Sequence, residues 1–219
     1  MLFFLMNGMT ITECIMAFIV LMISFTIHEV AHGLVAMWCG DNTAKNLGRL
    51  TLDPRAHLSM DGLIAMLLLP IGWAKPVPIN SRNFKNAKLG IFLVSIAGIT
   101  ANVLLAFVTC LIACVFISFF SVENQFIIAF VMVASLIIEI NMCLAVFNLI
   151  PFPPLDGSKL LWFLLPPKAV QKVAELERYG MVPLFIFVII FNDQLDWLIM
   201  NATTAILSLV SLITGVPLS

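Results

Sequence analysis

The chain has 219 residues, of which 62% are hydrophobic and only 11% are charged. This composition excludes an ordinary soluble domain and is typical of a protein that crosses a membrane several times. The formal net charge of −1 provides no basic surface for nucleic acid, so we expect no nucleic-acid partner.

Apolar runs predict the membrane-spanning helices, because about 20 apolar residues suffice to cross a bilayer. The predicted spans cover about 11–39, 89–120, 125–150 and 179–191. A further run at about 195–215 contains scattered Ser and Thr, and it either crosses the membrane or lies against its surface. These runs predict an all-α polytopic membrane protein, with a bundle of about four to six transmembrane helices in a single domain over 1–219.

The segment between the first two long spans differs from the rest of the chain. Residues 40–61 are polar, and the apolar stretch 63–73 is too short to cross a bilayer, which favours a re-entrant or interfacial segment. Segments 48–52 and 75–79 have the pattern of extended chain, since prolines interrupt any helix nearby.

Lysine and arginine residues predict the orientation. Seven of the eleven lie in 40–88 and the other four in 151–178, so the opposite side of the membrane has none. By the positive-inside rule both segments are cytoplasmic and the N-terminus is outside. We therefore expect a multi-pass protein of the cell membrane.

Residues 28–32 read His-Glu-Val-Ala-His, near the predicted cytoplasmic end of the first span. On a helix His28 and His32 are one turn apart on the same face, where two imidazoles can bind zinc beside Glu29 as a base. The pattern also occurs by chance, but ionisable side chains are costly inside an apolar span. The sequence therefore predicts a zinc site within the membrane, in its cytoplasmic half.

A catalytic zinc usually has three protein ligands, so one more donor is needed. The chain contains only one other histidine, His57, which either approaches the metal or anchors its loop. Asp156 is the stronger candidate because it follows the third span on the same side of the membrane. Prolines stop that helix, and Gly157 would let the backbone turn the carboxylate back toward the metal. The alternative is that Asp156 and Gly157 form an ordinary loop turn.

Residues 28–32 together with 148–157, Asn-Leu-Ile-Pro-Phe-Pro-Pro-Leu-Asp-Gly, resemble the site-2 protease family of intramembrane zinc metalloproteases. Three further segments resemble its compact bacterial branch, which lacks PDZ and CBS domains: 48–52, 72–78 and 95–102. The resemblance runs from about residue 20 to about 180. It implies that His28, His32 and Asp156 bind one Zn²⁺ per chain and that Glu29 is the general base.

Other polar residues are weaker candidates. Asn102 and Asn148 match asparagines of the family that steady the substrate backbone or the oxyanion, although hydrogen bonding between helices is an equal alternative. Glu139 lies in the middle of a span, where it faces a polar cavity, pairs with Asn141 or another span, or is protonated.

The sequence also departs from the family in the loop. Asp53 stands where the family more often has Asn, and Ser-Met at 59–60 replaces its usual Asp-Pro.

The resemblance implies an endopeptidase that cuts membrane proteins in or near a transmembrane segment, with the lipid bilayer as its surroundings. Segment 75–79 could hold such a substrate by strand addition. The alternatives are a divalent-metal transporter and a proteolytically inactive membrane scaffold. The sequence gives no prediction of oligomeric state.

Overall fold

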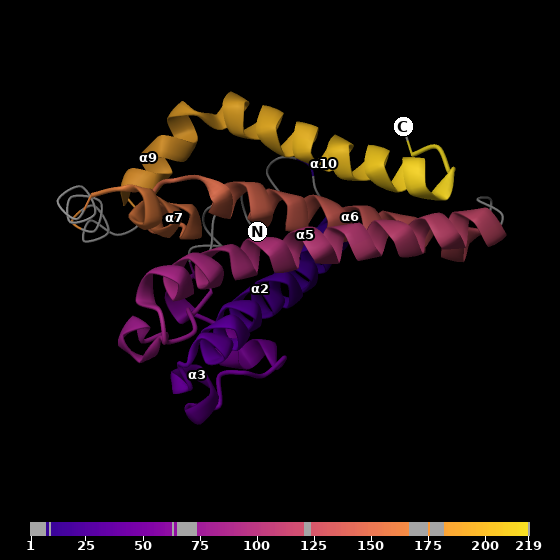
Figure 1. The fold of residues 1–219 in the computed structure, drawn as a ribbon. Helices are drawn as coiled ribbons and strands as arrows, with labels where there is room; N and C mark the ends of the chain where they lie inside the picture. Colours follow the sequence, from indigo (N-terminus) through magenta and orange to yellow (C-terminus); the bar gives the residue numbers. More distant parts are fainter. Residues whose placement is uncertain are drawn as a thin grey trace. The chain divides into compact units, whose positions relative to one another are not determined.

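A computed structural model describes residues 10–62, 74–120, 124–166 and 182–218, together with Gly8, Ile64 and Glu175 (Figure 1). Every regular element in these ranges is a helix, which confirms the all-α prediction. The chain divides into two compact units, Met1–Gly90 and Ile91–Ser219. A single domain over the whole chain stays a prediction.

The first unit is built on α2, Ile11–Cys39, which matches the predicted first span. Thr10 and Glu13 form a capping box at its start: Glu13 N–H donates to Thr10 Oγ1 and Thr10 N–H donates to Glu13 Oε2. The helix ends at Gly40, whose φ of 115° is in the left-handed region that glycine adopts freely. Local sequence signals thus set both ends of the span.

After α2 the first unit contains short helices and extended chain. These are α3 (Thr43–Asn46), η1 (Pro54–His57), an irregular segment over 74–80, and η2 (Ser81–Asn83). Segments 48–52 and 75–79 are non-helical, as predicted. The predicted re-entrant stretch 63–73 lies outside the described residues, apart from Ile64.

Asp41, directly after α2, connects three parts of the first unit through hydrogen bonds to its carboxylate. Its carboxylate, 1% exposed, accepts hydrogen bonds from Thr43 N (3.1 Å), Asn80 N (2.7 Å) and Asn83 Nδ2 (2.7 Å). Burial alone would raise the pKa of Asp41, but these hydrogen bonds outweigh it and lower the pKa. Asp41 therefore fixes the position of the chain after residue 79.

In the second unit, α6 (Gln125–Leu149) lies along α5, and α10 (Asn192–Thr214) packs against α6 (Figure 1). Helix α5 runs Ala87–Phe119 and begins at the end of the first unit. Their core is made of small and medium side chains. Its buried members are Ala106, Cys110, Cys114, Ile138, Met142, Ile206 and Val210. Large apolar side chains such as Phe119, Phe126 and Leu212 are instead 79–85% exposed, as expected for helices surrounded by lipid.

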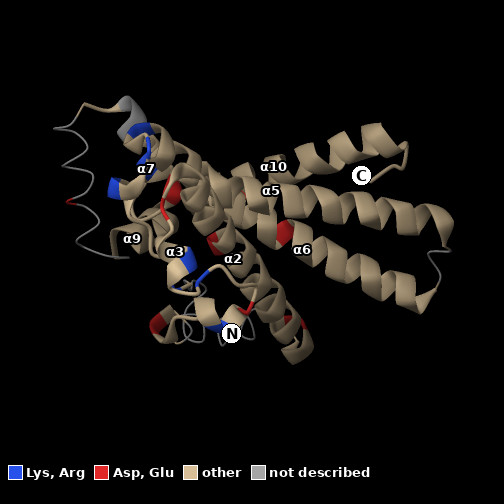
Figure 2. Cartoon of the chain, turned by 60° about the horizontal axis from the view of Figure 1, so that its bottom comes forward, with Lys and Arg blue, Asp and Glu red and all other residues tan. Residues whose placement is uncertain are grey.

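Among the described residues, four helices are long and apolar enough to cross a membrane: α2, α5, α6 and α10. This is the lower end of the predicted four to six, and by length and composition it favours a crossing for the last apolar run. The predicted span at 179–191 is described only as α9, Val182–Ile190, whose nine residues are too short to cross. Figure 2 shows long stretches of α5, α6 and α10 without charged residues. In the described part of the chain, Lys88 lies in the first turn of α5, and the other basic residues lie on connecting segments and short helices.

Candidate metal centre

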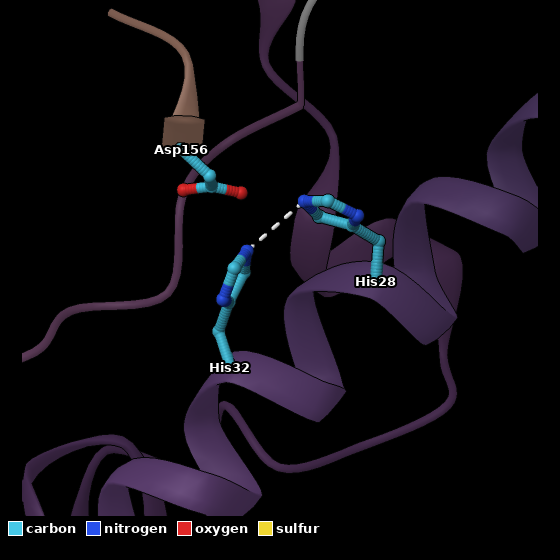
Figure 3. A group of neighbouring side chains, drawn as sticks. All are labelled: His28, His32 and Asp156. Carbon is cyan, nitrogen blue, oxygen red and sulfur yellow. Dashed lines mark hydrogen bonds between the residues drawn. The ribbon is translucent and has the colours of Figure 1, made fainter. Parts of the chain in front are cut away.

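The two histidines of α2 face one another as their spacing predicts. Both side chains are buried, 4% and 6% exposed, and the Nε2 atoms of His28 and His32 are 3.0 Å apart (Figure 3). The ring planes are close to perpendicular, at 84°. Two ring nitrogens this close require a proton on one of them or a cation between them, because two lone pairs repel each other.

This donor pair fits zinc. Two imidazole nitrogens bound to a tetrahedral zinc at about 2.05 Å would be about 3.3 Å apart, close to the spacing observed. The pair therefore needs little rearrangement to bind the metal. Imidazole and carboxylate groups are also the usual ligands of catalytic zinc sites.

Glu29 lies on the same turn of α2 and is half-buried. Its Oε2 accepts a hydrogen bond from the backbone N–H of Val77, at 2.8 Å. Val77 is buried and belongs to the irregular segment 74–80. A loop residue far along the sequence thus fixes the carboxylate of the predicted general base.

Gly33 follows His32 directly and lets this segment approach α2. A Cβ at Gly33 would lie 2.4 Å from Leu50 Cδ2 and 3.2 Å from Val77 Cγ1. The absence of a side chain here leaves room for Leu50 and Val77 close to α2.

Asp156 is the first residue of α7, Asp156–Leu164, in the second unit. As predicted, α6 ends before the prolines and residues 150–155 are non-helical. A new helix starts at Asp156, so Asp156 and Gly157 do not form an ordinary loop turn. The carboxyl group is 8% exposed, and Lys159 Nζ donates to its Oδ1 at 3.2 Å. Asp156 is thus a buried carboxylate of the kind that the sequence predicts as the third metal ligand.

The expected reason for Gly157 is wrong. Its φ is not positive, so it is not needed for a left-handed turn. A Cβ at Gly157 would instead lie 2.3 Å from the carbonyl oxygen of Leu149 and 2.4 Å from that of Ile150. Glycine is required here because α7 starts against the end of the α6 backbone.

The two asparagine candidates differ in their surroundings. Asn102 is fully buried, and its Nδ2 donates to Asn141 Oδ1 at 2.7 Å between α5 and α6. This contact is the helix–helix alternative considered above. Asn148 is half-buried in the last turn of α6, and its Nδ2 donates to the Leu144 carbonyl oxygen at 3.0 Å.

His57 has its own hydrogen-bond partners in the loop of the first unit. His57 is buried, its Nε2 is 3.0 Å from the Thr51 carbonyl oxygen, and it forms no metal-binding group with His28 and His32 among the described residues. Its backbone carbonyl accepts from Lys75 N at 2.8 Å, so it anchors two loop segments.

Glu139 is exposed on the outside of α6. The predicted pairing with Asn141 is not formed, because the Asn141 amide binds Asn102 and the Ile137 carbonyl oxygen.

Sequence reasoning did not identify Val77, Arg49 or Asp41 as parts of this region. Arg49 Nη2 donates to the carbonyl oxygens of Lys75 and Pro76, directly before Val77. Arg49 and Val77 both lie in segments that resemble the protease family, which was the available signal. Their contacts could not be read from spacing, because they join residues 26 to 48 positions apart.

Known proteins resemble the chain as follows. A model of peptidase family M50 matches residues 117–191. "Putative zinc metalloprotease YwhC" of Bacillus subtilis (strain 168) is 40% identical over 195 residues, which are 84% of this chain and 85% of that protein. "Putative zinc metalloprotease Rip2" of Mycobacterium tuberculosis (strain H37Rv) is 28% identical over 171 residues, 75% of this chain and 63% of that protein. Rip2 of the Erdman strain gives 28% over 167 residues. No solved structure matches.

Proposed function

Since the chain belongs to peptidase family M50, the site-2 protease family of zinc metalloproteases, we propose that it hydrolyses peptide bonds in or near the transmembrane segments of membrane proteins. The observation that carries the proposal is the pair of facing imidazoles on α2. A helix apolar enough to cross a membrane holds His28 and His32 with their Nε2 atoms 3.0 Å apart. Such a costly arrangement in lipid is expected where a metal compensates it.

In this proposal His28, His32 and Asp156 bind one zinc ion. Each contributes a ligand type that catalytic zinc accepts, and each is buried away from competing water. Lys159 binds one oxygen of Asp156 and orients the carboxylate, as partners of metal ligands commonly do. A bound zinc supplies a Lewis acid, which polarises the peptide carbonyl and acidifies water.

Glu29 is the general base. It takes a proton from the water whose oxygen attacks the scissile carbonyl carbon, and it gives that proton to the leaving amine as the C–N bond breaks. The Val77 N–H donates to Oε2, so Oε1 is the oxygen with the greater capacity left to exchange the proton. The same hydrogen bond orients the carboxylate.

The irregular segment 74–80 limits how a substrate is held. Lys75 and Val77 already donate their N–H groups within the chain, and Pro76 and Pro78 have none. Strand addition over 75–78 would therefore use hydrogen bonds from substrate N–H groups to carbonyls of the segment, and none in the opposite direction. Two of these carbonyls, those of Lys75 and Pro76, already accept from Arg49. Asn148 is the further candidate for a substrate contact.

The active site is proposed to open toward the cytoplasm, with the N-terminus outside. The asymmetry of lysine and arginine along the sequence supports this orientation. Reporter fusions within 40–62 and after residue 166 should be cytoplasmic, and a fusion at the N-terminus should not be.

The first test is zinc content in detergent-purified protein. We expect close to one zinc per chain in the parent, loss of zinc in Asp156→Ala, and retention in His57→Ala. Absence of metal in a folded parent, or loss only in His57→Ala, would contradict the proposed ligand set.

Glu29→Gln separates the three functions considered. A protease loses cleavage of a transmembrane substrate by about 10²–10⁴-fold and keeps its zinc. A metal transporter keeps its flux, and a scaffold loses nothing, so cleavage that survives this change would refute the role of Glu29.

A further inference from the structure

The irregular segment 74–80 is held at both of its ends. Near its start Lys75 N–H donates to the His57 carbonyl oxygen at 2.8 Å. At its end Asn80 N–H donates to Asp41 Oδ2 at 2.7 Å. The two acceptor residues, His57 and Asp41, are buried and belong to the first unit. The segment between these two contacts therefore cannot move freely.

Arg49 donates hydrogen bonds to two backbone carbonyls of the segment, directly before Val77, the residue that binds Glu29. Its Nη2 lies 2.9 Å from the Lys75 carbonyl oxygen and 3.2 Å from that of Pro76. The next N–H along the chain is that of Val77, which donates to Glu29 Oε2. Bonds from a guanidinium to two carbonyls are charge-assisted and stronger than neutral ones.

Because the segment is stiff, hydrogen bonds to the carbonyls of Lys75 and Pro76 also fix the position of the Val77 N–H. The rings of Pro76 and Pro78 fix φ on both sides of Val77, so the peptide units around it move together. Neither proline has an N–H that could hold the segment in place of Arg49. Without the arginine, the long-range hydrogen bonds between the segment and other described residues would be its two end contacts and the bond to Glu29.

We propose that Arg49 is a positioning residue for Glu29, because it holds the 75–77 backbone where the Val77 N–H fixes the carboxylate. The inference rests on the proposed function, in which Glu29 is the general base. Arg49 itself touches neither substrate nor metal. Its loss therefore changes the chemical step rather than zinc binding or substrate affinity.

The test compares Arg49→Met with Arg55→Met in the full-length, zinc-loaded protein. Arg55 is a matched control: it lies in the same loop, its side chain is 86% exposed, and its ion pair is with Asp53 alone in the described part of the chain. For cleavage of a model transmembrane substrate, Arg49→Met should lower kcat by about 10- to 100-fold and change KM by less than about twofold. Zinc content should be unchanged, and Arg55→Met should behave as the parent.

Arg49→Lys gives a graded comparison. A lysine ammonium keeps the charge but not the planar guanidinium, so it should recover part of the lost kcat. A kcat in Arg49→Lys no higher than that of Arg49→Met would mean that a positive charge beside the two carbonyls does not position Glu29. A rise in KM with kcat unchanged would make Arg49 a substrate-binding residue instead. Loss of zinc would make it structural. Each of these results would overturn the proposal.

Hydrogen exchange provides a readout that does not depend on catalysis. The Val77 amide should exchange faster in Arg49→Met than in the parent, and at the parental rate in Arg55→Met. Unchanged exchange at Val77 in Arg49→Met overturns the proposal even if activity falls. A parent that cleaves nothing but shows the expected exchange difference refutes the proposed function and leaves the contact established.

Discussion

Gly157→Ala adds one methyl group beside a proposed zinc ligand. The new Cβ would lie 2.3 Å from the Leu149 carbonyl oxygen, whereas real Cβ atoms essentially never come within 3.0 Å. The backbone of α7 must therefore shift by at least 0.7 Å, the difference between these two distances, because the atoms it meets are backbone atoms at the end of α6.

Two effects oppose each other in this variant. Alanine favours a helix over glycine by up to about 1 kcal/mol. Overpacking against backbone atoms, which have no alternative rotamer, costs about 1–3 kcal/mol of stability. Displacement of a metal ligand can lower the rate by about 100-fold. Because backbone atoms cannot rotate away, we expect the clash to dominate. Gly157→Ala should lower the free energy of unfolding, weaken zinc binding and reduce kcat.

Gly33→Ala is the matched comparison, since Gly33 also follows a proposed ligand directly. Its nearest neighbour is Leu50 Cδ2 at 2.4 Å, the end of a flexible side chain that can rotate. The same methyl group should therefore cost less here. Zinc affinity from competition with a chelator, and thermal unfolding in detergent, measure both variants. Parental zinc affinity in Gly157→Ala, or a larger loss in Gly33→Ala, would refute this reasoning.

Two further predictions concern residues outside the metal centre. Asn102→Leu or Asn141→Leu should each destabilise the second unit by about 1–3 kcal/mol, because each removes one partner of a buried hydrogen bond; unfolding of the double variant should show less than the sum. Asp41 has a lowered pKa in the folded chain, so its hydrogen bonds stabilise the fold fully above about pH 4 and this contribution is lost as pH falls through the folded value. Asp41→Asn should therefore be less stable than the parent at pH 7, and the difference should narrow below pH 4; an equal difference at both pH values would contradict this.

The histidine pair shows how much a local pattern can determine. The positions of His28 and His32 follow from the 3.6-residue period of a helix, and the length of α2 follows from its apolar run and its caps. The same reasoning placed α5 and α6 to within a few residues. These features depend only on neighbours along the chain, so the sequence alone is sufficient to predict them.

Asp156 marks the limit of this reasoning. The sequence singled it out as an acid after the third span, but did not predict that a new helix begins at Asp156. Prolines before it were correctly expected to end α6. Whether the chain then resumes as a helix depends on packing against the end of α6, which Gly157 permits.

The fold class, the principal spans and the candidate zinc ligands could be predicted from the sequence, because they follow from bilayer thickness, helix period and the chemistry of the side chains. Only the tertiary structure revealed that Val77 binds Glu29, that Arg49 holds the chain before Val77, and that Asn102 pairs with Asn141. These bonds join residues 26 to 48 positions apart, where no periodicity links donor to acceptor. Their formation depends on how the loop packs against α2 and how α5 packs against α6, which is a property of the folded chain.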